Sequence, residues 1–217
     1  MISDLFYELD WFTLGSLVVL LLMSILSWSI LIAKYLTCRK IDQQTSKFLN
    51  QMEGEIRFSE LMSLAEKKNN FPAQKLFLFS AQDLNRLKKN YSQESIPKTL
   101  AEESLQRSFE LIFSKFSRDV YRGFSLLASV SNSAPFVGLF GTVTGVLRTL
   151  YRLGGETGAL GFNRISPSLS IALVATAFGL FVAIPASVGY NLLKSRVENL
   201  QSLLQEVKVN IEKRILS

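Results

Sequence analysis

Three long stretches without a charged residue dominate the pattern of hydrophobic and polar positions along this 217-residue chain. They cover residues 11–33, 123–147 and 165–193. Each is longer than the run of about 20 apolar residues that a helix needs to cross the hydrocarbon layer of a membrane. The pattern therefore predicts an all-α membrane protein with three transmembrane helices, which we place at residues 11–36, 123–150 and 166–193.

Apolar residues outside the spans recur at helical rather than strand spacing. The stripe nearest the second span steps by 4-3-4-4 positions through Leu105, Phe109, Ile112, Phe116 and Val120. No glycine or proline interrupts it before Gly123. We therefore expect one helix of roughly fifty residues that lies half in the cytosol and half in the membrane.

A second stripe follows the third span and steps by 4-3-4-3-4 positions through Leu193, Val197, Leu200, Leu204, Val207 and Ile211. This spacing is typical of a helix that packs along another helix. The neighbouring helix belongs either to this chain or to a second subunit, and the sequence leaves both possibilities open.

The basic residues indicate how the chain is oriented in the membrane. The net charge is +6, and 21 of the 24 Lys and Arg residues fall in 34–122 or 194–214, whereas the first ten residues hold three acidic side chains and no base. Basic residues near spans collect on the cytoplasmic side. The expected layout is an external N-terminus at 1–10, a cytoplasmic helical domain at 37–122, an external loop at 151–165 and a cytoplasmic C-terminal helix at 194–217.

Two further expectations follow from the charges. Acidic residues nearly balance the basic ones within the cytoplasmic part, so no nucleic-acid partner is predicted. The N-terminus lacks the basic leader of a signal peptide and no A-x-A-like site follows the apolar run, so we expect the first span to be permanent.

The residue types that most enzymes and metal sites require are scarce. The chain has no histidine and a single cysteine, Cys38, which excludes a Cys/His zinc site, a Cys/His or Ser/His catalytic pair and an internal disulfide. Neither a phosphate-binding P-loop nor a dinucleotide fingerprint is present. We therefore predict no catalytic residue, no metal and no cofactor. Cys38 follows the first span, where acylation is conceivable, but an inert small side chain is the favoured interpretation.

The second and third spans differ from ordinary lipid anchors. The first span is bulky nearly all round, as expected of a helix that faces lipid, whereas the other two each carry small and hydroxyl residues along one line. In the second span this line holds Ala128, Ser131, Pro135, Gly138, Thr142, Gly145 and Thr149. In the third span it holds Ala172, Thr176, Gly179, Ala183 and Ala186, with Ala175 and Ser187 beside it. A hydroxyl gains nothing from lipid tails, so these stripes should face protein or a water-filled path.

Close helix packing and a pore are two explanations of the stripes. Small residues let two backbones approach, and Gly141 to Gly145 form a G-x-x-x-G. The residues expected to pack against a helix or partner are Pro135, Gly138, Gly141, Gly145, Ala172, Ala175, Gly179, Ala183 and Pro185. Each stripe also places a threonine near mid-membrane, which a pore explains better. The pore-lining candidates are Thr142, Thr176, Ser131 and Thr149. Both explanations can hold together, because one helix can pack along one side and line a lumen along another.

The second and third spans contain no side chain that could relay a proton, because neither holds Asp, Glu, Lys or Arg between residues 123 and 147 or between 166 and 193. The threonine hydroxyls can only donate and accept hydrogen bonds. If protons pass along this path, a partner must therefore supply the carboxylate.

Two segments of these spans resemble a known family. Residues 134–145 read APFVGLFGTVTG, and residues 172–186 read ALVATAFGLFVAIPA, followed by Tyr190 and Asn191. This pattern is similar to the TolQ/ExbB branch of the MotA/TolQ/ExbB proton-channel family, and the length and the three spans agree with it.

The resemblance implies a multi-pass protein of the bacterial inner membrane, with the external segments in the periplasm. It implies a homopentamer around a dimer of a single-span ExbD/TolR-like partner, whose membrane aspartate faces Thr142 and Thr176. Proton flow would then drive work at the outer membrane through a TonB- or TolA-like protein. The sequence does not distinguish a TolQ-like from an ExbB-like role.

One position departs from the family pattern. Members of this branch commonly carry a glutamate early in the third span, and alignment on Pro167, Ala172 and Leu173 places Ile171 there. A second carboxylate from this subunit is therefore not expected.

The alternative function is a structural membrane scaffold that uses the small-residue stripes only to assemble. A membrane-bound enzyme is not favoured, because no set of catalytic residues in the sequence supports it.

Overall fold

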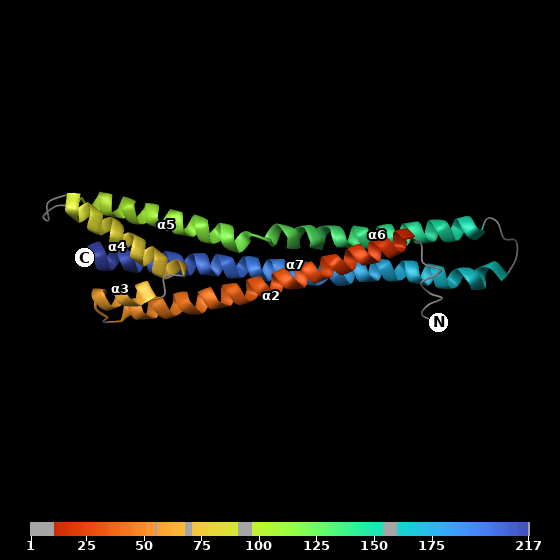
Figure 1. Ribbon diagram of the computed structural model, residues 1–217, viewed down its shortest axis with the longest axis horizontal. Coiled ribbons are helices and arrows are strands. Elements are labelled where there is room, and N and C mark those ends of the chain that lie inside the picture. Colours follow the sequence, from red (N-terminus) through yellow and green to blue (C-terminus); the bar gives the residue numbers. More distant parts are fainter. Residues whose placement is uncertain (1–10, 55, 68–70, 91–96, 154–159, 217) are drawn as a thin grey trace. The chain divides into compact units, whose positions relative to one another are not determined.

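The computed structural model describes residues 11–54, 56–67, 71–90, 97–153 and 160–216. These residues form helices and contain no strand, which confirms the all-α prediction (Figure 1). The helices are α2 (Trp11–Glu53), α3 (Phe58–Lys67), α4 (Pro72–Asn90), α5 (Lys98–Tyr121), α6 (Phe124–Leu153) and α7 (Leu160–Leu216). The expected external segment at 1–10 lies outside the described residues.

Three helical stretches of the described residues are long and apolar enough to cross a membrane, which confirms the predicted number of spans. They are Trp11–Glu53, Thr99–Tyr151 and Leu169–Arg214. The chain divides into two compact units near the ends of the uncharged runs. We call Met1–Ala33 with Gly123–Leu192 the span unit, and Lys34–Arg122 with Leu193–Ser217 the polar unit.

The expected fifty-residue helix is wrong, because the backbone breaks at Arg122 and Gly123. Arg122 is extended, with φ −61° and ψ 115°, and its N–H donates to the Arg118 carbonyl. Gly123 has φ +99°, a conformation that side chains with a Cβ rarely adopt. Helix α6 starts again at Phe124, and the Leu127 N–H donates to the Gly123 carbonyl.

The span unit packs α2, α6 and α7 around a small apolar core. Its buried members are Leu20, Val130, Ala134, Val182, Ala183 and Ala186. Bulky residues of α6 such as Phe136, which is 71% exposed, point away from this core and can contact membrane lipid. Helix α2 is not uniformly lipid-facing as expected, because one side of it is buried. That side includes Thr13, Ser16, Leu20 and Ser27.

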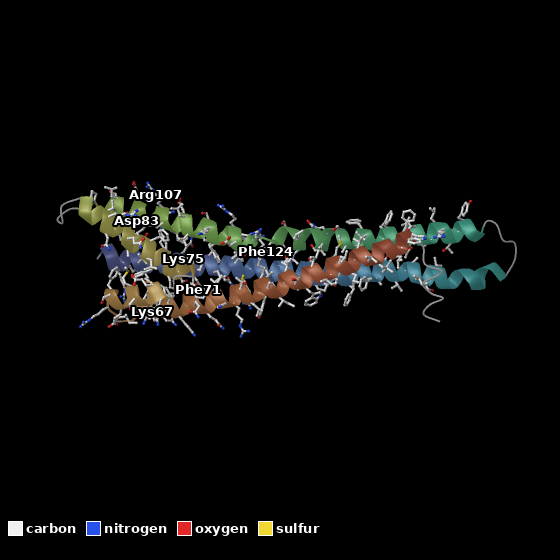
Figure 2. All side chains as sticks on the ribbon, viewed as in Figure 1. Lys67, Phe71, Lys75, Asp83, Arg107 and Phe124 are labelled. Carbon is white, nitrogen blue, oxygen red and sulfur yellow. The ribbon has the colours of Figure 1, made fainter. Side chains whose placement is uncertain are left out.

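The polar unit combines the later part of α2 with α3, α4, α5 and the last turns of α7. The rings of Phe48 on α2 and Phe77 on α4 meet edge to face with centroids 5.7 Å apart. The Ser108 hydroxyl of α5 donates to the Asp83 carboxylate of α4 over 3.0 Å. Asp83 and the nitrogen-tipped side chains of Lys75 and Arg107 are labelled on this unit in Figure 2.

The stripe after the third span packs within this chain. Its six members, Leu193, Val197, Leu200, Leu204, Val207 and Ile211, are all buried in the polar unit. The ammonium of Lys208 lies 5.7 Å from the centre of the Phe109 ring on α5. Farther along α7, Arg214 donates to the Ile56 carbonyl over 2.8 Å. Of the two possibilities left open by the sequence, the structure therefore supports packing against the chain's own helices.

Candidate functional site

The hydroxyls of Thr142 on α6 and Thr176 on α7 are in direct contact. Both also approach one carbonyl, that of Gly138, with oxygen distances of 3.0 Å from Thr142 and 3.3 Å from Thr176. The pair is half-buried. Two hydroxyls carry two protons for these three contacts, so lone pairs remain that can accept a hydrogen bond from another group. The pair can therefore accept a hydrogen bond from a carboxylic acid as it stands, and it can donate to a carboxylate when one hydroxyl turns away from its present partner.

Glycines bring the two threonines together. A Cβ on Gly138 would lie 2.7 Å from the Ala175 carbonyl oxygen and 3.1 Å from Thr176 Cα. A Cβ on Gly179 would lie 2.7 Å from the Ala134 carbonyl oxygen. Backbone atoms cannot move aside as the end of a flexible side chain can. The absence of side chains at these glycines therefore permits the close approach of α6 and α7.

The remaining small residues of the predicted packing set extend this contact in both directions. A Cβ on Gly141 would lie 3.0 Å from the Ala175 Cβ, and one on Gly145 would lie 2.7 Å from the Ala172 Cβ. Ala183 is buried in the core of the span unit. Pro135 and Pro185 are half-buried within α6 and α7.

The other two pore candidates do not join the threonine pair. Ser131 donates to the Ala128 carbonyl over 3.0 Å, and Thr149 donates to the Gly145 carbonyl over 2.7 Å. At 1.5 Å rise per residue they stand roughly 16 Å and 10 Å along α6 from Thr142. Thr149 is 5% exposed and so scarcely reaches the surface of this chain. A pore-lining role for any of the four residues stays a prediction.

Two residues of α2 belong to this site and were missed by the sequence reasoning. The Thr13 hydroxyl donates to the Gly141 carbonyl over 3.2 Å, and Ser16 lies against Gly141. A signal for them exists in the spacing, because Thr13, Ser16, Leu20, Met23 and Ser27 step by 3-4-3-4 positions. Because the first span is strongly apolar on average, its hydropathy does not reveal that one side of the helix carries polar residues.

Among the described residues, the site offers hydroxyls and carbonyls but no acid. Ile171 is half-buried on α7. Among the described residues no group of three or more His, Cys, Asp or Glu side chains could hold a metal ion. Hydrogen bonding to a group brought by another molecule is therefore the chemistry that this arrangement supports.

Cys38 lies in the polar unit and is 1% exposed. A thiol that is covered by its own chain is not accessible to an acyl donor. The structure therefore favours the inert side chain over the acylation site.

Comparison with known proteins relates the chain to membrane transport proteins. Residues 80–206 match the MotA/TolQ/ExbB proton channel family. The biopolymer transport protein ExbB of Neisseria meningitidis serogroup A is 28% identical over 204 residues, which are 94% of this chain and 92% of the relative. The Tol-Pal system protein TolQ of Haemophilus influenzae is 27% identical over 200 residues, 91% of this chain and 86% of the relative. The ExbB protein of Aquifex aeolicus is 41% identical over 83 residues, 38% of this chain and 55% of the relative.

The family match covers more than half of the chain and includes α6 and most of α7, where the threonine pair lies. Relatives named ExbB and TolQ align with similar identity over nearly the whole chain, so the comparison does not separate the two. The chain thus belongs to the MotA/TolQ/ExbB proton channel family, whose members are multi-pass membrane channel proteins rather than enzymes.

Proposed function

We propose that this protein is the stator subunit of a TolQ-TolR or ExbB-ExbD type motor in the bacterial inner membrane. It couples the proton motive force to work at the outer membrane. The observation that carries the proposal is the Thr142–Thr176 pair, held on the Gly138 carbonyl within the two uncharged stretches at residues 123–147 and 165–193. The spans are residues 11–36, 123–150 and 166–193, with the N-terminus in the periplasm and the C-terminus in the cytoplasm.

The proposed partner is a dimer of a single-span ExbD/TolR-like protein inside a pentamer of this chain. A buried carboxylate is costly unless it is protonated or hydrogen-bonded. The lone pairs of the two hydroxyls can accept from the protonated form, and a hydroxyl that turns away from its present partner can donate to the ionised form. An aspartate of the partner that cycles between these forms beside the pair would carry the proton, and no second carboxylate from position 171 is needed.

The energy available sets a requirement on the motor. Each proton that crosses the membrane potential releases about 2.3 kcal/mol per 100 mV. This is a small amount per proton, so useful work requires several protons or an added pH difference. A TonB- or TolA-like protein is the proposed recipient of this work at the outer membrane.

Replacement of the two hydroxyls tests the pore assignment in cells. We expect Thr142→Val and Thr176→Val to leave assembly intact and to abolish the energy-dependent process that fails when the protein is deleted. Thr144→Val is the matched control, because the Thr144 hydroxyl bonds to the Phe140 and Gly141 carbonyls of its own helix. Normal function of both the Thr142 and the Thr176 variant would show the pore assignment to be wrong.

A structural scaffold is the second candidate, because the glycine contacts that pack α6 against α7 within this chain do not require ion conduction. The two candidates respond differently to loss of the proton gradient. A proton-driven stator stops when an ionophore collapses the gradient, whereas a scaffold continues. Undiminished function after collapse would therefore favour the scaffold.

A further inference from the structure

The first turn of α2 contacts α6 one residue before Thr142. The Thr13 side chain is buried, and its hydroxyl donates to the Gly141 carbonyl across 128 positions of the chain. A Cβ placed on Gly145 would lie 3.3 Å from the Thr13 hydroxyl oxygen, so Thr13 lies between two glycines of the same face. Beside it, the rings of Phe12 and Phe140 meet edge to face at 6.5 Å.

We propose that Thr13 is a positioning residue whose hydrogen bond to Gly141 holds α6 so that Thr142 meets Thr176. Gly141 and Gly145 also face α7, because a Cβ on them would meet Ala175 and Ala172. Among the described residues at this site, the hydrogen bonds between α6 and α7 are those of Thr142 and Thr176 themselves, so the bond from Thr13 is a further directional contact made by a third helix. A hydrogen bond weakens steeply when its angle changes. The role in ion conduction rests on the proposed function, whereas the effect on geometry does not.

Small rotations of α6 would matter at the threonine pair. With Cα atoms about 2.3 Å from the helix axis, a rotation of roughly 20° moves a side chain by about 1 Å. Hydrogen-bond lengths span about half that distance, from roughly 2.7 to 3.2 Å. Loss of the Thr13 bond can therefore separate the hydroxyls of Thr142 and Thr176 without unfolding either helix.

Removal of the Thr13 hydroxyl should not leave a buried acceptor without a partner. The Gly141 carbonyl also accepts a hydrogen bond from the Thr144 hydroxyl at 3.1 Å. Thr13→Val keeps the branched shape of the side chain and removes only the donor. Ser27→Ala is the matched control, because Ser27 is buried on the same side of α2 but its hydroxyl donates to the Met23 carbonyl within the helix.

Disulfide formation measures the geometry directly. The full-length protein with Thr142→Cys and Thr176→Cys, in a Cys38→Ser background, is oxidised in native membranes, and the disulfide is followed by mass spectrometry after alkylation. We expect Thr13→Val to slow its formation about threefold, the factor that corresponds to an average interhelical hydrogen bond in a membrane. Thr13→Ser should restore the rate, and Ser27→Ala should leave it unchanged. Equal rates for Thr13→Val and Ser27→Ala would overturn the proposal.

Proton flux through the native complex separates this proposal from the proposed function. We expect the single Thr13→Val variant to lower the flux per assembled complex and Thr13→Ser to restore it. If the unmodified complex carries no flux but Thr13→Val still slows the disulfide, the proposed function fails and the positioning contact stands. If flux depends on Thr142 but Thr13→Val changes neither measurement, the positioning contact fails and the proposed function stands.

Discussion

At the scale of single residues, the lack of a side chain at the glycines matters as much as the hydroxyl groups of the threonines. The hydroxyls of Thr142 and Thr176 can touch only because Gly138 and Gly179 let α6 and α7 come into backbone contact. Each of these glycines faces a carbonyl oxygen or a Cα of the opposite helix, atoms that cannot adjust by changing a rotamer. The pair is therefore sensitive to a single added methyl group.

Gly138→Ala tests this dependence. The new Cβ would lie 2.7 Å from the Ala175 carbonyl oxygen, so the helices must separate. We expect a loss of about 1–3 kcal/mol, as for overpacked cores, seen as a lower melting temperature of the detergent-purified protein. Gly15→Ala is the control, because a Cβ there meets nothing within 4 Å. If the two variants melt alike, the close contact of α6 and α7 is not present in the protein.

The threonine pair could be anticipated from the sequence, but the hydrogen bond from Thr13 to the Gly141 carbonyl was not. Thr142 and Thr176 stand out because each is a hydroxyl in a stripe of small residues, a pattern with few explanations. Thr13 lies among bulky apolar residues, so the average hydropathy of its span does not single it out. Spacing also cannot tell which hydroxyls bond across helices, as Thr13 does, and which bond within their own helix, as Ser131 and Thr149 do.

At the scale of elements, the apolar stripes report which side of a helix is buried but not whether the helix is continuous. The stripe of α5 continues into α6, since Val120, Phe124 and Leu127 keep helical spacing and are all buried. Gly123 nevertheless adopts φ +99° between them. The predicted fifty-residue helix failed because side-chain periodicity carries no information about one backbone angle.

Gly123→Ala tests whether this break is built into the protein. A residue with a Cβ in the left-handed region costs about 1–2 kcal/mol, so we expect a lower melting temperature. Gly54→Ala serves for comparison, because a Cβ there would meet only ordinary contacts, the nearest being the Gln51 carbonyl oxygen at 3.6 Å. An unchanged melting temperature for Gly123→Ala would mean that α5 and α6 form one continuous helix.

The stripe of α7 makes a second prediction at this scale. Val207 is fully buried and Val209 is 45% exposed, although the two residues are identical and lie two positions apart. Truncation of Val207 to alanine should cost about 2 kcal/mol through lost apolar burial and the cavity left behind. Val209→Ala should change stability little. Equal losses in chemical unfolding of the purified protein would contradict the packing of α7 within its own chain.

At the scale of the whole molecule, the protein supplies hydroxyls but no acid in the spans that contain the candidate site. Its 24 basic residues are concentrated outside these spans, and its large aromatic and aliphatic side chains cover the outside of the span unit. In the proposed function, such a chain shapes the path for protons, and the partner brings the carboxylate that carries them.

Proton flux into liposomes shows whether the Thr142–Thr176 pair belongs to a proton path. The complex is isolated on a tag carried by this chain, reconstituted with whatever partner accompanies it, and exposed to an imposed potential while a dye inside the vesicles reports pH. We expect flux in the unmodified complex and in Thr144→Val, and only background acidification in Thr142→Val and Thr176→Val. Equal flux in all four complexes, or none in any of them, would contradict this expectation.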